Sequence, residues 1–83
     1  MEKFDSLRSG GPATVTIWGP DGARLYQYTS NDYHTIEEAI RGTLDKAGLN
    51  ISPEDCVFEV TNDDTSVSHK YRFNAHGHLK LII

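Results

Sequence analysis

Apolar and polar residues alternate in five short segments of this chain, and one central segment repeats its apolar residues at three- and four-residue spacing. Alternation with a period of two is typical of a half-buried strand, whereas the longer spacing is typical of an amphipathic helix. The alternating segments are residues 13–18, 24–29, 56–61, 67–73 and 79–83. The helical spacing begins after Thr35 and ends before Gly48. The pattern therefore predicts the element order ββαβββ.

Both ends of the predicted helix carry capping residues. Thr35 and Glu38 form a capping box, in which each side chain accepts a hydrogen bond from the other residue's backbone N–H. Gly48 stands where a helix commonly ends in a left-handed conformation. Gly42 destabilises the helix interior by about 1 kcal/mol relative to alanine. Its presence therefore indicates that the helix approaches the sheet closely at this position. The stripe predicted to face the sheet consists of Ile36, Ala39, Ile40, Thr43, Leu44 and Ala47.

Turn-forming residues separate the strands and define the fold class. The sequence GPDG at residues 19–22 closes the first hairpin, and polar clusters at 62–65 and 74–77 close two more. Hairpins on both sides of the helix predict an α+β fold, with one helix packed on one face of a mainly antiparallel five-stranded sheet. Residues 13–83 form this single small domain. Residues 1–12, which end in SGGP, are expected to be a flexible N-terminal tail.

Strand periodicity also assigns side chains to the two faces of the sheet. Beneath the helix stripe we expect Tyr71, Phe73, Leu79 and Leu81, with Cys56, Phe58 and Val60 on the same side. The opposite, open face is predicted to carry Thr14, Thr16, Trp18, Arg24, Tyr26, Tyr28, Ser68, Lys70, Arg72 and Lys80.

Length and composition limit the classes of protein to consider. With 83 residues, 37% of them hydrophobic, the chain can bury one core and has little room for an enclosed cofactor. One cysteine excludes an internal disulfide. No apolar run approaches the ~20 residues of a membrane span, and the charged opening is unlike a signal peptide. We therefore expect a cytoplasmic protein with no cofactor and no membrane contact, and its compactness favours a prokaryotic or phage origin.

No residue pattern predicts catalysis or a metal site. His76 and His78, with His69 nearby, form the one metal-like grouping, but further ligands for a tetrahedral site are missing. A polar hairpin turn explains these histidines better. Cys56 alternates with Phe58, which indicates a small core residue instead of a nucleophile. The sequence also lacks a nucleophile elbow and a phosphate-binding loop. We therefore do not expect an enzyme.

The predicted open face is the most informative feature for function. Arginine and aromatic residues are enriched at protein interfaces. The expected function is a non-enzymatic binding or adaptor module that engages a protein partner, or a second copy of itself, through this face. The expected binding residues are Trp18, Arg24, Tyr26, Tyr28, Lys70 and Arg72.

Three alternatives to a protein-binding face stay open at this point. The same face can bind single-stranded nucleic acid, with Arg24, Lys70, Arg72 and Lys80 on the phosphates. The formal net charge of −4 disfavours this, because phosphate neutralisation dominates such affinity. The acidic surface can also inhibit a nucleic-acid-binding enzyme. Finally, the face can be merely solvated, with its cross-strand pairs stabilising the sheet.

Overall fold

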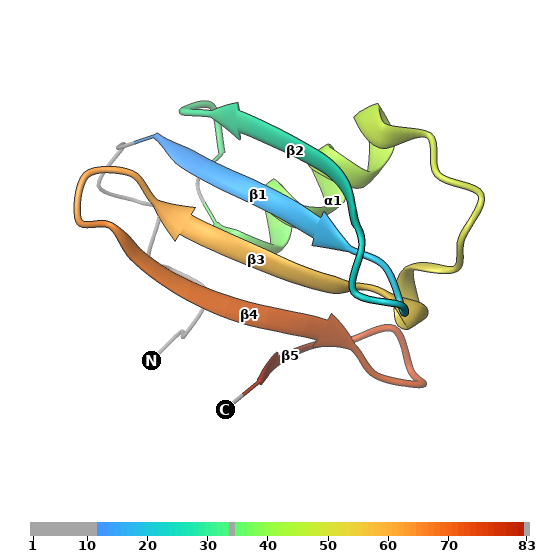
Figure 1. The fold of residues 1–83 in the computed structure, drawn as a ribbon. Coiled ribbons are helices and arrows are strands. Elements are labelled where there is room, and N and C mark those ends of the chain that lie inside the picture. The colour runs from blue at the N-terminus through green and yellow to red at the C-terminus, as the bar shows by residue number, and fades with distance from the viewer. Residues whose placement is uncertain (1–11, 34, 83) are drawn as a thin grey trace.

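The computed structural model describes residues 12–33 and 35–82, and in these ranges it contains one helix and five strands (Figure 1). The strands are β1 (Ala13–Trp18), β2 (Arg24–Ser30), β3 (Val57–Asn62), β4 (Val67–Phe73) and β5 (Leu79–Ile82). The helix α1 spans Ile36–Ala47, and a single 3-10 turn, η1, spans Pro53–Asp55. The order ββαβββ predicted from the hydrophobic pattern is confirmed.

All five strands form one antiparallel sheet in the order β2-β1-β3-β4-β5. The hairpin β1–β2 and the three-stranded meander β3–β4–β5 meet where β1 pairs with β3. The connection through α1 brings β3 back beside β1, and Figure 1 shows α1 on one side of the sheet, behind β1 and β2. The predicted small α+β domain, with one helix on a mainly antiparallel sheet, is therefore the observed fold. Within the described chain, no helix has the length and apolar character needed to cross a membrane.

The core lies between α1, η1 and the face of the sheet turned toward them. Ile17, Ile40 and Phe58 are fully buried, and the rings of Phe58 and Phe73 meet edge to face with centroids 5.4 Å apart. Tyr71, Phe73 and Leu79 are buried in the same cluster, and Leu81 and Leu44 pack against it. Helix α1 contacts chiefly β1, β2 and β3, whereas η1 covers β4. The predicted core face is thus correct, although the helix shares its covering with the 3-10 turn.

Local interactions fix both ends of α1. The Thr35 hydroxyl accepts a hydrogen bond from the backbone N–H of Glu38 at 3.1 Å, and Gly48 closes the helix with φ of 59°. We expected Gly42 to mark a close contact between the helix and the sheet, but its nearest neighbour is the Tyr33 side chain. A Cβ at Gly42 would lie 2.5 Å from the hydroxyl oxygen of Tyr33, so the glycine accommodates the tyrosine ring.

Most of the predicted N-terminal tail, residues 1–11, lies outside the described residues. Pro12, its last residue, is held in place by the loop that follows β3. The carbonyl of Pro12 accepts a hydrogen bond from the backbone N–H of Asp63 at 2.9 Å. This bond aligns the start of β1 with the end of β3, which is where those two antiparallel strands meet.

Candidate functional site

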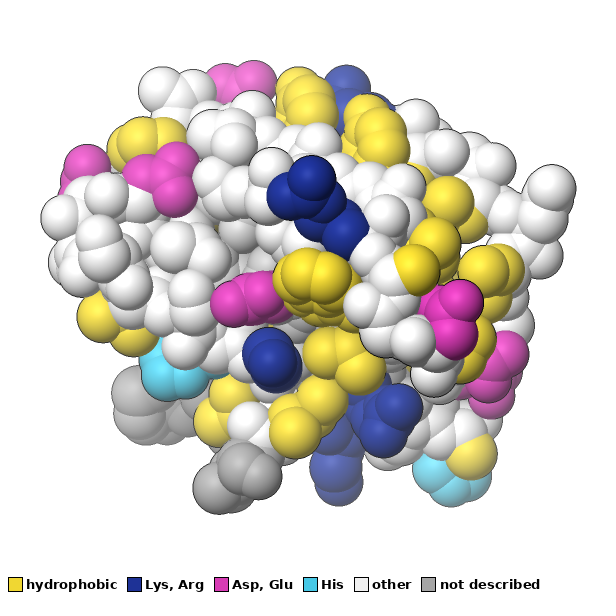
Figure 2. Space-filling model, in the orientation of Figure 1, with side chains coloured by type: hydrophobic (Ala, Val, Ile, Leu, Met, Phe, Trp, Pro, Cys, Tyr) yellow, Lys and Arg dark blue, Asp and Glu magenta, His cyan; other side chains and the backbone are white. Residues whose placement is uncertain are grey.

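The sheet face opposite α1 carries one tryptophan among polar and basic side chains, and we call it the open face. Directly paired residues of neighbouring strands point to the same side of a sheet, so the observed register assigns its members. Figure 2 views this face and shows hydrophobic groups near its centre with Lys and Arg side chains around them. By register the open face comprises Thr14, Thr16, Trp18, Arg24, Gln27, Thr29, Val57, Glu59, Thr61, Ser68, Lys70, Arg72, Lys80 and Ile82.

Two predicted binding residues, Tyr26 and Tyr28, lie on the helix side instead. Tyr26 pairs with Ile17 and Tyr28 pairs with Val15, and both of these β1 residues are buried in the core. Tyr26 packs against the core cluster, and the ammonium group of Lys46 in α1 lies 5.0 Å from the centre of the Tyr28 ring. The prediction that these tyrosines share a face with Trp18 was wrong.

A β-bulge explains both this error and the correct placement of Arg24. The register shifts between Ile17, which pairs with Tyr26, and Trp18, which pairs with Arg24, so Leu25 is an extra residue. Uninterrupted alternation keeps Arg24, Tyr26 and Tyr28 on one face. The bulge separates them and brings Arg24 beside Trp18 while the tyrosines stay under the helix.

Trp18 is the last residue of β1 and is half-buried on the open face, where a hydrogen bond and a neighbouring side chain orient its ring. Its indole N–H donates a hydrogen bond to Oε1 of Glu59 at 3.1 Å. Its neighbour across the β1–β3 pair is Val57, which places an aliphatic side chain beside the ring. A large aromatic surface held by a hydrogen bond and by packing loses little conformational entropy on binding. Trp18 is therefore suited to serve as an interaction anchor.

A hollow of about 550 Å³ adjoins one side of Trp18 and combines apolar and basic groups. Ile82 and Val57 contribute apolar surface, and Ile82 is 38% exposed. Lys70 and Arg72 contribute charge. The turn residue Asp21 is nearby in sequence, and its carboxylate accepts a hydrogen bond from the backbone N–H of Ala23. The residues lining this hollow are Trp18, Gly19, Pro20, Gly22, Val57, Lys70, Arg72 and Ile82.

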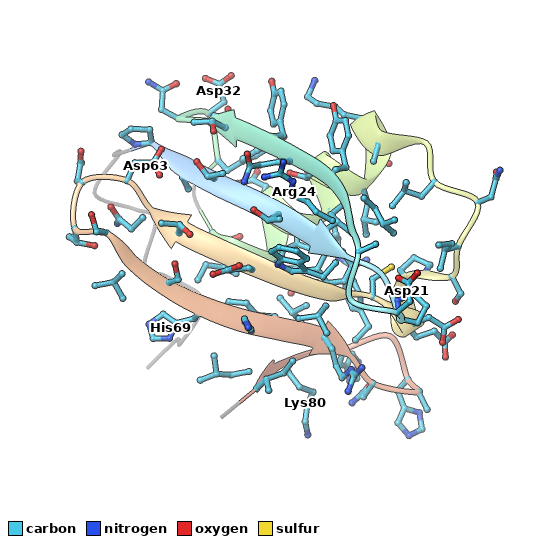
Figure 3. All side chains as sticks on the ribbon, in the orientation of Figure 1. Asp21, Arg24, Asp32, Asp63, His69 and Lys80 are labelled. Carbon is cyan, nitrogen blue, oxygen red and sulfur yellow. The ribbon has the colours of Figure 1, made fainter. Side chains whose placement is uncertain are left out.

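The basic side chains of the open face form no ion pair within the described part of the chain, where the ion pair found is Arg41 with Glu37 on α1. Arg24 is paired with Trp18 across β1–β2, and Arg72 with Lys80 across β4–β5. Lys70 is opposite Glu59 in the register. Figure 3 shows Arg24 beside β1 and β2, and Lys80 beside β5. The face thus holds four of the chain's eight basic residues around Trp18.

On the other side of Trp18, a second hollow of about 420 Å³ is lined mainly by hydroxyl, amide and carboxylate groups. The Thr14 hydroxyl donates to the Asp63 carboxylate at 3.1 Å, and Figure 3 shows Asp63 at the start of β1. The Gln27 amide donates to the Thr16 hydroxyl at 2.9 Å. These groups largely satisfy one another, so this half of the face is less prepared to bind a charged ligand than the basic half.

The sequence prediction omitted six residues from the open face, namely Gln27, Thr29, Val57, Glu59, Thr61 and Ile82. The alternation that buries Phe58 and Val60 places Val57 and Glu59 on the opposite side, so the signal was present in the sequence. Their importance depends on neighbours from other strands, however. Glu59 orients Trp18, while Val57 and Ile82 complete the apolar floor beside it.

A smaller hollow of about 220 Å³ lies on the helix side, between α1, η1 and the β4–β5 turn. Arg41 is its main polar group. The guanidinium donates to the carbonyl of Gly77 at 3.2 Å, pairs with Glu37, and lies 5.0 Å from the centre of the Phe73 ring. Because these contacts already engage Arg41, the hollow is better explained as a junction that fastens the last hairpin to the helix.

The cysteine and histidines are placed apart from the open face. Cys56 is fully buried, and burial raises the pKa of its thiol, with the charge of Asp55 adding to the effect. A raised pKa reduces the thiolate fraction and hence nucleophilicity. His69 lies early in β4, while His76 and His78 lie in the hairpin beyond its end, their ring centroids 6.4 Å apart. Across the described residues, no His, Cys, Asp and Glu side chains gather in threes to suit a metal.

Comparison with protein-family models, with curated proteins and with solved structures found no match to this chain. The open face therefore has to be interpreted from its own geometry and charge.

Proposed function

We propose that this protein is a non-enzymatic binding module whose open face binds an acidic segment of a protein partner. The observation that carries the proposal is the placement of Trp18 among Arg24, Lys70, Arg72 and Lys80 on the uncovered face of the sheet. The chain has a formal net charge of −4, so this concentration of positive charge runs against its overall composition.

The arrangement resembles the usual anatomy of a binding interface. Residues that dominate binding energy are enriched in tryptophan and arginine, and they lie in a desolvated centre surrounded by a polar rim. Here Trp18, Val57 and Ile82 form an apolar centre, and the cations form the rim. The fixed indole provides the anchor, and the rim selects the charge of the partner.

Charge complementarity favours a different protein over a second copy docked face to face. A twofold dimer through the open face would place the same patch of each copy against itself. Lys70 and Arg72 would then face the equivalent cations of the second copy, and like charges at an interface disfavour the complex. An acidic segment instead neutralises these cations.

Nucleic acid is the competing partner for the same cations. Single-stranded nucleic acid binds by stacking bases on several aromatic side chains along a basic groove. With Tyr26 and Tyr28 turned to the helix side, Trp18 is the aromatic residue that the register leaves on this face. A single stacking position supports nucleic-acid binding less well than it supports a protein anchor. The acidic-inhibitor alternative would use other surfaces and gains nothing from this arrangement.

The test is a direct comparison of probes. Trp18 is the single tryptophan of the chain, so its fluorescence reports on the open face without labelling. We expect an acidic glutamate-rich peptide to shift Trp18 emission and bind in a salt-sensitive manner, more tightly than a single-stranded oligothymidine of equal length. Removing a hot-spot aromatic costs at least ~2 kcal/mol, so Trp18→Ala, followed with a labelled peptide, should weaken binding about 30-fold.

Two charge reversals provide the matched comparison. Arg72→Glu lies on the open face, whereas Lys46→Glu makes a similar change on the helix side. Affinity purification from the native host should recover a partner with the wild type and with Lys46→Glu, and lose it with Arg72→Glu and Trp18→Ala. Equal recovery by all four proteins would exclude the open face as the binding surface. Oligonucleotide binding without peptide binding would replace this proposal with the nucleic-acid alternative.

A further inference from the structure

Strand β2 forms one edge of the sheet, and no other strand of the described chain pairs with its outer side (Figure 1). An edge strand presents a row of backbone donors and acceptors that another strand can pair with. Natural proteins block such edges with proline, with charged residues, with bulges or by shortening the strand. The opposite edge strand, β5, is short, at four residues, and carries Lys80.

Strand β2 has few of these protective features. It is seven residues long, contains no proline, and its single charged residue, Arg24, is at its start. The bulge at Leu25 also lies near the start, so residues 26–30 keep a regular register with β1. The long, regular and uncharged part of β2 is therefore open to pairing.

The sequence of β2 is complementary to itself in antiparallel orientation. In an antiparallel pair, the N–H and C=O groups of two directly opposite residues both point toward the partner strand or both point away from it. Because this direction alternates along a strand, two copies of one edge can pair only about a twofold axis that passes through a residue. An axis at Gln27 places Tyr26 opposite Tyr28 of the second copy, twice. The bulge turns Arg24 to the open face, whereas Ser30 pairs with Ala13 on the helix side, so pairing across this axis is regular for residues 26–28. Arg24 of each copy lies toward the Ser30 end of the other, so no like charges meet. Aromatic cross-strand pairs are among the favourable ones in sheets.

Neighbouring registers are less favourable. An axis at Tyr26 places Tyr28 opposite the bulged start of the copy's strand and leaves Thr29 and Ser30 without partners. An axis at Tyr28 pairs Tyr26 with Ser30 and sets Tyr28 opposite its own copy, which gives one aromatic pair instead of two. Of the three axes, only the one at Gln27 pairs Tyr26 with Tyr28 of the copy twice, within the regular segment that follows the bulge. The register is thus specified by the symmetric Tyr-Gln-Tyr sequence at residues 26–28.

We propose that two copies of this chain associate through β2, with the twofold axis at Gln27, and join their sheets into one continuous antiparallel sheet. Because the axis runs perpendicular to the sheet, both helices lie on one side and both open faces on the other. The proposal rests on the edge strand and is independent of the partner of the open face. Such a dimer would display two Trp18 anchors on one surface, toward diagonally opposite ends of the joined β1–β2 strands, which favours a partner with two acidic segments.

The test is the oligomeric state of the full chain as a function of concentration, by sedimentation velocity. Gln27 faces its own copy across the axis, so Gln27→Lys and Gln27→Glu each place like charges opposite one another. Each variant alone should weaken the dimer about fivefold, the order expected for opposed like charges in a sheet. An equimolar mixture of the two should restore association, because opposite charges then meet.

Ser68→Lys is the control, since it adds the same charge to the same face on β4, remote from the β2 edge. It should leave the dimer unchanged, and circular dichroism should show that all variants fold. A wild type that stays monomeric at the highest soluble concentration would overturn the proposal. The proposal would also be overturned if Gln27→Lys and Gln27→Glu both dimerise as strongly as the wild type, or if mixing the two variants does not restore association.

Discussion

The indole N–H of Trp18 donates a hydrogen bond to Oε1 of Glu59 over 3.1 Å, from a diagonal position on the neighbouring strand. In the β1–β3 register, Trp18 is opposite Val57, and Glu59 is opposite Thr16. Glu59 is also opposite Lys70 on its other side. One carboxylate therefore orients the indole ring and lowers the positive charge of the basic patch next to it.

These two roles of Glu59 can be separated by substitution. Glu59→Gln keeps a hydrogen-bond acceptor for Trp18 and removes the charge, whereas Glu59→Ala removes both. We expect Glu59→Gln to preserve the Trp18 emission maximum and to tighten binding of an acidic peptide about two- to fivefold, the size of an exposed charge interaction. Glu59→Ala should increase the mobility of the ring, seen as lower fluorescence anisotropy. If both variants leave emission and affinity at wild-type values, neither role is correct.

The burial of Ile40 tests how α1 is attached to the sheet. Ile40 is 0% exposed at the centre of the helix stripe, so Ile40→Ala should lower the free energy of unfolding by about 2–5 kcal/mol. Urea denaturation measures this against the ~5–15 kcal/mol typical of a whole domain. The control is Asp45→Ala, at an exposed position of the same helix. Lys46→Ala is not a neutral reference for a stability measurement, because the Lys46 ammonium contacts the Tyr28 ring. Equal midpoints for both variants would contradict the assigned face.

Gly42 should resist substitution by alanine despite its position within a helix. Alanine raises helix propensity by about 1 kcal/mol, but its Cβ would lie 2.7 Å from two ring carbons of Tyr33, which packs against the core. Overpacking typically costs about 1–3 kcal/mol, so the net expectation is destabilisation by about 1 kcal/mol. In a Tyr33→Ala background the same change should instead stabilise. Thermal unfolding of the four proteins in this cycle measures the coupling, and additive effects would show that Gly42 and Tyr33 do not interact.

Buried tyrosine makes the fold sensitive to alkaline pH. Burial raises the pKa of Tyr71 above its ordinary value of about 10, which Tyr71 regains in the unfolded chain. The unfolded state therefore loses its proton first as the pH rises. The resulting contribution to stability is fully present below pH ~10 and is lost as the pH climbs through the folded-state pKa. Tyr71→Phe should make the decline in unfolding free energy shallower. Burial also raises the pKa of Tyr33, so part of the decline in unfolding free energy with pH should remain in Tyr71→Phe. An unchanged slope in Tyr71→Phe would show that Tyr71 ionises equally in both states.

Local sequence determined the elements and most of the core. The helix follows from capping residues at Thr35 and Gly48 and from apolar spacing between them, which are interactions within a few residues of chain. The faces of β3 and β4 follow in the same way, because Phe58 and Val60, or Tyr71 and Phe73, alternate with polar residues and only one arrangement buries them. The fold class could be predicted for this reason.

The face of β2, the order of the strands and the arrangement around Trp18 were decided only by tertiary structure. Alternation puts Leu25 on the side of β2 opposite Tyr26 and Tyr28, so both sides carry apolar surface and the pattern alone does not identify the buried one. Pairing with β1 determines which side of β2 is buried, and a bulge at Leu25 turns Arg24 away from the tyrosines. Glu59 meets Trp18 because the chain returns through α1 and places β3 beside β1. Periodicity reports which side of a strand is apolar, whereas hydrogen-bonded pairing between distant segments determines which side chains become neighbours.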